Sequence, residues 1–421
     1  MSADEKLLLE RLEKGKVAPP EPEEAPEPRR QVVREVEFEG RGEEKPRSRA
    51  SEPTFAGCLR LLKWVTRLIV WSVLLIGGGL IAAMHLLGQS NVTVAALMYA
   101  PPLPWLVAPA LLLIPALLFD WKSGLVLLLS VPAYLYWHTD FIPQGPGSEV
   151  RRSMHTVKVL TWNRGQAKKA SLSQLKRELR PDLIFLQDAK LTHYQNNPDY
   201  SDFPTIHGVG DFVMLSRWPA LSMDPLFPPR DAAVTERRAW GVRCVVAAAG
   251  RRCVIYNLHL PTPRDALESY MRGAFLWGIL GHLPLGDWEA KRLHYEAFWQ
   301  PYLTFAENFR RQLAQEIGPV LVLGDFNTPP FGPIHQGLTD GLIDCHRAAG
   351  SGFGYTFPGD TRNPLAFFQP WLRLDRVHAS DHWKPLSCRP VEAPAQHLPL
   401  MVELDLPPPT LVPPHVLPDD P

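Results

Sequence analysis

The sequence lacks an excess of either charge, and it has little cysteine. Forty-four Lys and Arg residues balance forty-four Asp and Glu residues over 421 positions. A nucleic-acid binder that can be recognised from composition has an excess of basic residues, so the balanced charge removes the simplest argument for that class. Neutrality over the whole chain does not exclude a local basic patch. None of the five cysteines forms a Cys-x-x-Cys motif, and nothing marks one as a nucleophile. Cys244 and Cys253 flank an expected hairpin and could either pair or fill a core.

Charge is almost absent from one long stretch of the chain. Between Leu68 and Thr139 the only Asp, Glu, Lys or Arg residues are Asp120 and Lys122. We therefore interpret residues 58–145 as a transmembrane region and predict three spans, at about 68–87, 103–119 and 125–142. The second and third spans are short and contain proline, so a re-entrant hairpin remains an alternative.

The charges that flank this region predict its orientation. Arg60, Lys63 and Arg67 lie at the start of the first span, which favours a cytoplasmic amino terminus. Three crossings then place the remainder outside the cytoplasm, on the far side of an inner or plasma membrane. Arg151 and Arg152, just after the third span, argue mildly against this orientation.

The rest of the chain divides by composition. Residues 1–57 are rich in charge and proline and are expected to be disordered, and residues 407–421 form a proline-rich tail. Residues 157–406 have ordinary composition, with short apolar runs typical of strands between helical stretches. This pattern predicts one α/β domain whose chemistry lies at strand ends.

Polar side chains follow several of the predicted strands. Carboxylate and carboxamide oxygens suit Mg²⁺, and the absence of a Cys/His cluster disfavours zinc. Two histidines add groups that exchange protons near neutral pH. Such a set favours in-line attack of water on a phosphate ester. The candidate residues are Asn163, Asp188, His259, Asp325, Asn327, Asp375 and His397.

In order along the chain, these motifs resemble the endonuclease/exonuclease/phosphatase superfamily of metal-dependent phosphoesterases. The resemblance rests on Thr161-Trp162-Asn163, Leu186-Gln187-Asp188, Asn257-Leu258-His259, Gly324-Asp325-Phe326-Asn327, Arg373-Leu374-Asp375 and His397-Leu398-Pro399-Leu400, and it covers residues 157–406. It implies a four-layer αββα sandwich.

The resemblance also implies a role for each candidate residue. Asn163 and Asp188 would serve the metal, and His259 would donate to the phosphate or the leaving group. The other roles concern the attack itself: Asp325 and Asn327 would position the nucleophile, while Asp375 would orient His397 as the general base.

The chain departs from the family pattern at two positions. Asp188 stands where the family usually has Glu, and Ala395-Gln396-His397 stands where it usually has Ser-Asp-His. A literal Ser380-Asp381-His382 lies only five residues after Asp375, and we reject it as the catalytic copy because a strand and a loop separate these motifs in the family. Between the motifs of His259 and Asp325, residues 264–318 form an aromatic-rich insertion that is either a lid or a helical pair with its own core.

We therefore predict a membrane-anchored phosphoesterase that uses Mg²⁺, with Mn²⁺ as a substitute, on a phosphodiester or phosphomonoester. The alternative is a catalytically silent relative that binds a phosphorylated ligand or partner, motivated by Asp188 and Gln396. The substrate could be nucleic acid, lipid or inositol phosphate, because the fold does not choose among them.

Overall fold

The protein is described by a computed structural model. The predicted tail at 1–57 lies outside the described residues except for its last three positions, and the tail at 407–421 except for its first two. For residues 288–292 only the backbone is described. The described ranges are 55–143, 152–165, 170–229, 238–263, 288–360 and 370–408.

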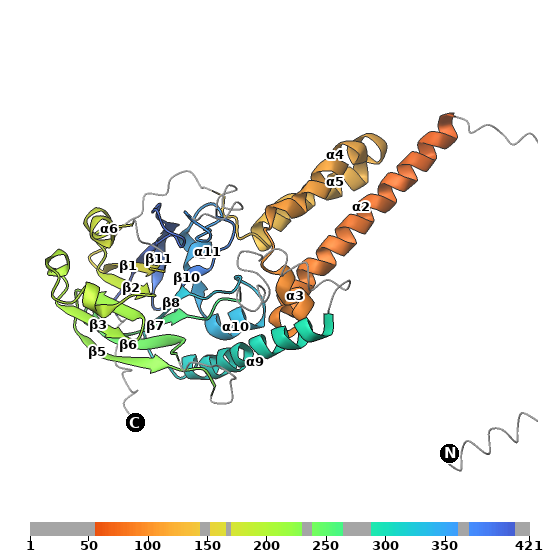
Figure 1. Cartoon of the computed structure of the whole chain (residues 1–421). Helices are drawn as coiled ribbons and strands as arrows, with labels where there is room; N and C mark the ends of the chain where they lie inside the picture. Colours follow the sequence, from red (N-terminus) through yellow and green to blue (C-terminus); the bar gives the residue numbers. More distant parts are fainter. Residues whose placement is uncertain are drawn as a thin grey trace, which may run out of the picture. The chain divides into compact units, whose positions relative to one another are not determined.

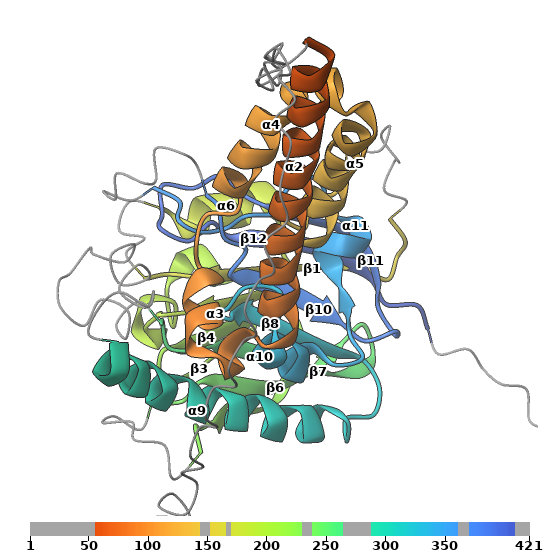
Figure 2. The ribbon, with the colours of Figure 1, turned by 90° about the vertical axis from the view of Figure 1, so that its right-hand side faces the viewer.

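The amino-terminal part of the described chain is helical. A long helix is followed by a short one, and then by two helices that form an antiparallel hairpin packed against the first (Figures 1 and 2). Arg67 of the long helix donates hydrogen bonds of 2.7 and 3.1 Å to Asp120 at the turn of the hairpin. The elements are α2 (Phe55–Leu86), η1 (Gly88–Ser90), α3 (Val92–Leu97), η2 (Leu103–Leu106), α4 (Val107–Phe119) and α5 (Trp121–Trp137).

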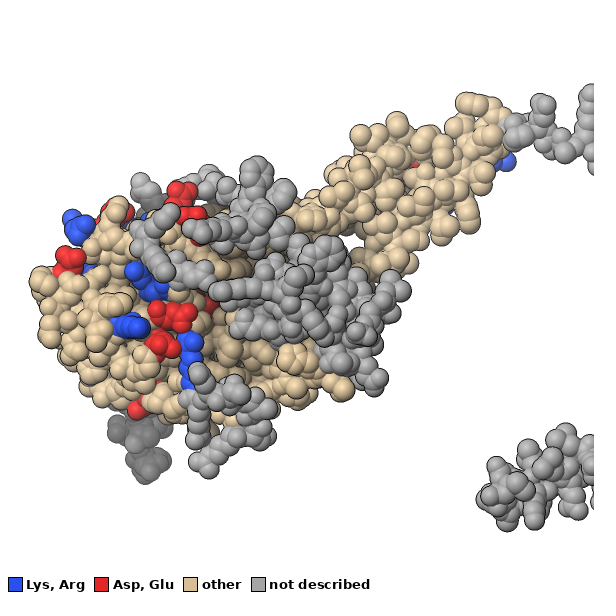
Figure 3. Space-filling model, viewed as in Figure 1, with Lys and Arg blue, Asp and Glu red and all other residues tan. Residues whose placement is uncertain are grey.

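The prediction of three membrane spans is not confirmed. Among the described helices, α2 alone is long and apolar enough to cross a membrane by length and composition, while residues 103–119 form a shorter apolar helix. At about 1.5 Å per residue, α4 and α5 extend roughly 20 and 26 Å, less than the ~30 Å of a hydrocarbon core. The buried, ion-paired Asp120 ends α4 and α5 ends at Trp137, so the third predicted span is shifted and shortened from 125–142. Figure 3 shows that these helices carry few charged side chains on the face in view, whereas charge gathers on the domain.

The domain contains two six-stranded sheets. In the first, β1 runs parallel to β2 and antiparallel to β12, and the strand order is β11-β12-β1-β2-β4-β3. Its strands are β1 (Thr156–Asn163), β2 (Leu183–Gln187), β3 (Thr205–Val209), β4 (Phe212–Ser216), β11 (Lys384–Pro390) and β12 (Leu400–Asp405).

The second sheet has the order β5-β6-β7-β8-β10-β9. β7 and β8 are parallel, and β10 is antiparallel to β8 with Asp375 opposite Asp325. Its strands are β5 (Ala220–Leu226), β6 (Gly241–Ala248), β7 (Arg251–His259), β8 (Val320–Asp325), β9 (Ile343–Asp344) and β10 (Asp375–Ala379).

Successive side chains along each strand point to opposite faces of the sheet, and this alternation produces the layers of the domain. Odd-numbered residues of β1, such as Val159, and of β8, such as Leu323, pack together between the sheets. Even-numbered residues face outward: Trp162 packs in the cluster of α6 (Leu172–Leu179), and Val322 in the cluster of α9 (Trp288–Leu313). Because successive side chains of a strand point to opposite faces, each sheet is buried on both sides. The predicted αββα sandwich is confirmed.

The remaining described helices are short. α10 (Pro333–Thr339) packs against α9, and α11 (Cys345–Ala349) packs against β11. Four cysteines are buried in the domain and none forms a disulfide, so the reading of Cys244 and Cys253 as core residues fits the structure.

Candidate active site

The alternation that builds the core also assembles the site. Asn163, His259, Asp325 and Asp375 are odd-numbered residues at the ends of β1, β7, β8 and β10, so they occupy the space between the sheets where the apolar core stops. Gly324 has a φ of +119°, and a Cβ there would lie 2.1 Å from the carbonyl oxygen of Leu258. This close backbone approach requires glycine directly before Asp325.

Asp325 is a fully enclosed carboxylate of the site. Its Oδ2 accepts hydrogen bonds of 2.8 Å from Asn163 Nδ2 and 3.1 Å from Asn327 Nδ2, and its Oδ1 accepts one of 2.9 Å from the Asn327 backbone N–H. Its side chain is fully buried. Three amide donors from both sheets therefore fix the position of one carboxylate.

Asp375 and His397 form a buried pair beside Asp325. His397 Nδ1 lies 2.9 Å from Asp375 Oδ2, and His397 Nε2 lies 3.7 Å from Asp325 Oδ2. Burial lowers the pKa of His397, but the charges of Asp375 and Asp325 outweigh it and raise that pKa to about 9. Burial and the charge of Asp325 raise the pKa of Asp375, against the opposing effect of His397. The structure thus favours an imidazolium held between two carboxylates.

A titration tests this electrostatic arrangement. In chelator, the histidine resonance that disappears in His397→Gln is expected to titrate near pH 9, and Asp375→Asn is expected to lower its pKa toward the ordinary value of about 6.5. NMR of histidine-labelled protein measures both values. Because the folded-state pKa is raised, the stability that this group adds is fully present below pH ~6.5 and is lost as pH rises through about 9. A pKa that Asp375→Asn leaves unchanged would contradict the assignment.

His259 and Asp188 lie on the open side of Asp325. His259 Nε2 is 3.3 Å from Asn163 Nδ2, and His259 Nδ1 is 3.6 Å from Asp188 Oδ1. Arg238 Nη2 donates a 2.6 Å hydrogen bond to Asp188 Oδ1 and lies 3.1 Å from His259 Nδ1, while Arg238 Nε contacts Asp211 at 3.0 Å. The half-exposed guanidinium of Arg238 therefore fixes the position of the Asp188 carboxylate.

The oxygen atoms at and around the Asp188 carboxylate suit a hard cation. A Cβ at Gly165 would lie 2.8 Å from Asp188 Oδ2 and 3.0 Å from Asn163 Oδ1, so the lack of a side chain leaves room beside both oxygens. Deeper in the site, ligand atoms of Asp325, Asp375 and His397 lie within 4.8 Å of one another, and Asp375 Oδ1 is buried without a hydrogen-bond partner. The donor set, mostly oxygen, suits Mg²⁺ or Mn²⁺ better than zinc.

The structure thus brings all seven predicted site residues to one end of the paired sheets. It also shows contacts of residues to which the sequence analysis assigned no role. Gln187 Nε2 donates to Asn257 Oδ1 at 2.5 Å and joins the two sheets beneath the site. Tyr99, two residues after the short helix α3, donates a 2.9 Å hydrogen bond to the carbonyl oxygen of Asn327. Arg238 follows a segment outside the described residues, and nothing in its local sequence marks it.

The structure also shows where the literal Ser-Asp-His triplet and part of the insertion at 264–318 lie. Ser380 Oγ accepts a hydrogen bond from the backbone N–H of Val320, so the literal Ser-Asp-His triplet lies at the opposite end of β8 from Asp325. In the insertion at 264–318, the carboxyl-terminal helix α9 packs Trp299 and Phe309 into the core, while Trp277 lies outside the described residues.

The domain has two facing sheets covered by helices, with carboxylates, amides and imidazoles at one end. This arrangement defines a four-layer sandwich hydrolase. A family model described as "Endonuclease/Exonuclease/phosphatase family" matches residues 160–400, more than half of the chain. The chain belongs to this family and is a hydrolase that acts on phosphate ester bonds.

Several solved structures are similar to the chain. An endonuclease/exonuclease/phosphatase from Bacteroides vulgatus is 15% identical, with a TM-score of 0.41 over 60% of this chain and 99% of that chain. The 3′ phosphatase NExo from Neisseria, bound to product DNA hairpin, is 20% identical, with a TM-score of 0.38 over 59% and 99%. The mannosyl-6-phosphatase Bt3783 from Bacteroides thetaiotaomicron is 13% identical, with a TM-score of 0.40 over 59% and 99%. No curated protein sequence matches the chain.

Proposed function

We propose that the protein is a membrane-anchored phosphoesterase that depends on Mg²⁺, with Mn²⁺ as a substitute. The observation that carries this proposal is the convergence of Asp325, Asp375 and His397 within 4.8 Å, with Asp325 fixed by Asn163 and Asn327. A carboxylate fixed beside a histidine–aspartate pair is suited to positioning water for attack on phosphorus.

The proposed division of labour follows the geometry. Asp375 holds the Nδ1 side of His397, and the free site favours the imidazolium. Nε2 therefore releases its own proton first and then takes a proton from the attacking water. Asp325 and Asn327 orient that water and the phosphate. As the ester P–O bond breaks, His259, on the open side, donates a proton or hydrogen bond to the phosphate or the leaving oxygen.

Asp188 and Asn163 are the proposed metal ligands. A bound Mg²⁺ would polarise the phosphate and offset its negative charge. Arg238 occupies one oxygen of Asp188 in the free chain, so we infer that the substrate phosphate becomes the new partner of Arg238.

The anchor is part of the proposal. α2 is the candidate membrane span, with Arg60, Lys63 and Arg67 on its amino-terminal side and the domain after its carboxyl-terminal end. By the positive-inside rule this orientation puts the domain outside the cytoplasm. Protease digestion of intact cells tests it, since only an external domain is cleaved.

Metal dependence is the direct test of the activity. The full-length protein in detergent is expected to hydrolyse a bis-aryl phosphodiester with Mg²⁺, to lose that activity in excess chelator, and to regain it when Mg²⁺ or Mn²⁺ is restored. Asp188→Ala should raise the Mg²⁺ concentration needed for half-maximal rate by about 10-fold or more. Activity that persists in chelator would reject the proposal.

A catalytically silent relative is the second candidate function. The ion pair between Asp188 and Arg238 favours it, because this pair neutralises the proposed metal carboxylate. In that case the site binds a phosphorylated ligand without cleaving it. Calorimetric titration separates the two: Mg²⁺ binding by the free chain supports the enzyme, and binding of a phosphate ester without Mg²⁺ binding or turnover supports the silent relative.

The substrate class is the next question. Nucleic acid, lipid and inositol phosphate are all candidates for the same arrangement of groups, and the Neisseria structure, a 3′ phosphatase bound to DNA, keeps nucleic acid among them. A turnover screen across DNA with a 3′ phosphate, sphingomyelin and inositol phosphates ranks them.

A further inference from the structure

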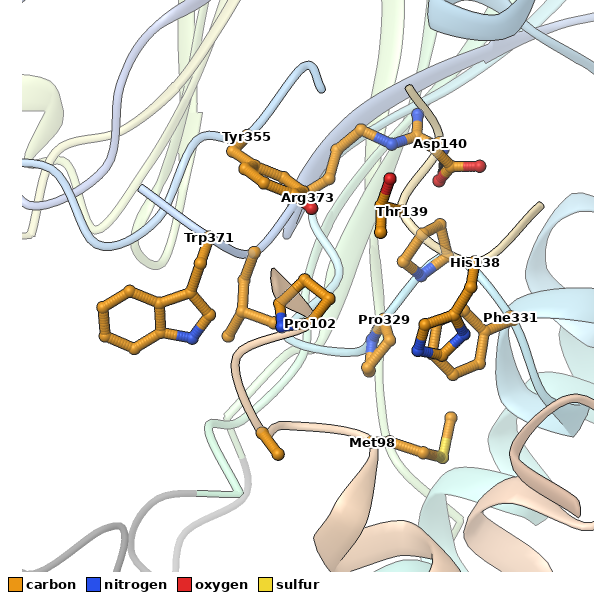
Figure 4. A pocket seen from close by; sticks show the side chains of 13 residues that line it. Met98, Pro102, His138, Thr139, Asp140, Pro329, Phe331, Tyr355, Trp371 and Arg373 are labelled. Atoms are coloured by element: carbon orange, nitrogen blue, oxygen red, sulfur yellow. Dashed lines mark hydrogen bonds and ion pairs between the residues drawn. The ribbon is translucent and has the colours of Figure 1, made fainter. Parts of the chain in front are cut away.

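Two cavities meet where the helices join the catalytic domain. The polar cavity, of about 30 Å³, lies between the chain after α5 and the loops that carry Phe331 and Trp371 (Figure 4). The helix cavity, of about 270 Å³, lies between α2, α5 and the start of α4. His138 lines both cavities, so the two cavities are neighbours at this junction.

The polar cavity holds hydrogen-bond donors that have no acceptor. Trp371 Nε1 and Arg373 Nε are buried without a hydrogen-bond partner, in residues that are 7% and 3% exposed. His138 Nδ1, which donates or accepts according to the ring tautomer, is also buried without a partner, in a residue that is 8% exposed. An indole and a guanidinium nitrogen can only donate, and a buried donor that stays unpaired destabilises the folded protein. The cavity is therefore built to receive an acceptor oxygen, and its volume admits a small group such as a carbonyl.

The charges around the polar cavity indicate that this acceptor is neutral. Arg373 Nη2 is paired with Asp140 Oδ2 at 2.8 Å and with Asp344 Oδ2 at 2.6 Å, and Arg347 is also paired with Asp140. Each guanidinium already faces a carboxylate, so an incoming anion would meet two negative side chains. An ester carbonyl satisfies the donors without that repulsion.

The helix cavity is lined almost entirely by apolar side chains. Its wall on α2 includes Gly77 and Gly78, where an added Cβ would meet nothing within 4 Å, and its other walls include Trp105 and Val131. Its size approaches the roughly 300 Å³ at which ligand pockets begin. Because α2 is apolar enough to cross a membrane, an acyl chain is the hydrocarbon that such a cavity meets first.

We propose that an ester-linked lipid binds at this junction, with its acyl chain in the helix cavity and its ester carbonyl in the polar cavity. The site is separate from the phosphoesterase site and does not depend on turnover. It adjoins that site, however, because Pro329 and Arg373 of the polar cavity lie two residues from Asn327 and Asp375. A bound lipid would therefore brace the two segments that carry these residues.

Photolabelling of the full-length protein tests the proposal. The probe is a monoacylglycerol with a diazirine in its acyl chain, added to the protein in detergent. We expect labels on α2 near Gly78 and on α5 between residues 130 and 137, with at least tenfold stronger competition from unlabelled monoacylglycerol than from an alkane of equal length. A fatty acid anion should compete less well than the ester.

Matched variants separate this site from general contact with lipid. Gly78→Leu fills the cavity and should reduce labelling at least about tenfold, whereas Gly79→Leu, equally open but not lining the cavity, should keep it. Trp371→Phe removes one donor and should weaken binding about 2- to 10-fold, whereas Trp383→Phe, which removes a buried unpartnered donor elsewhere, should not.

The result that overturns the proposal is equally specific. Labelling that is equal in both leucine variants, or spread over outward residues such as Leu75 and Ile76, means that lipid only surrounds the helices. Performing the labelling in Asp325→Asn as well keeps this outcome distinct from a failure of the phosphoesterase proposal, since binding is measured without turnover.

Discussion

Replacing His397 by alanine is expected to lower kcat/KM for a phosphodiester by about 10²- to 10⁴-fold, the usual contribution of a general base. The imidazole that lies 2.9 Å from Asp375 and 3.7 Å from Asp325 would be gone, and no other described histidine contacts both carboxylates. Steady-state kinetics with Mg²⁺ at saturation measures the loss. A change in kcat at unchanged KM indicates an interaction made in the transition state.

The control for this variant is present in the chain itself. His382 belongs to the literal Ser-Asp-His triplet, and its side chain is 39% exposed at the opposite end of β8. His382→Ala should leave kcat/KM within about twofold. If His382→Ala were inactive and His397→Ala active, the assignment of the catalytic histidine would be wrong.

The fold could be predicted because the patterns that indicate its strands lie within short segments of the sequence. Apolar runs such as residues 320–323 can be recognised one at a time, and Asn163, Asp188 and Asp325 each lie at or directly after the end of such a run. Alternation then places Asn163, Asp325 and Asp375 on the same side of their strands, between the sheets. The sequence order of the motifs was therefore sufficient to anticipate one site.

The contacts that join the helices to the site could not be predicted. Tyr99 and Asn327 are 228 residues apart, and Asp140 and Arg373 are 233 apart. No spacing or periodicity relates such pairs. The number of spans was also overestimated, because hydropathy does not show that α4 and α5 turn at an ion-paired Asp120 and stay short.

Among these contacts between distant parts of the sequence, those of Asp140 are expected to contribute most to the stability of the folded protein. Asp140 is 2% exposed, three residues after α5 ends, and it pairs with the buried Arg373 and with Arg347. Asp140→Ala leaves Arg373 with Asp344 as its remaining carboxylate partner, and we expect it to destabilise the folded protein by about 3 kcal/mol. Denaturant unfolding in detergent, followed by circular dichroism, measures the difference.

Activity should fall together with stability, because Arg373 lies two residues before Asp375 on the segment that enters β10. Asp381→Ala, with a side chain 91% exposed, is the matched aspartate control and should change stability by less than about 0.5 kcal/mol. If Asp140→Ala behaved like this control in both assays, the helices would be a passive tether. If it lost both stability and kcat/KM, the anchor would form part of the structure that holds the catalytic aspartate in place.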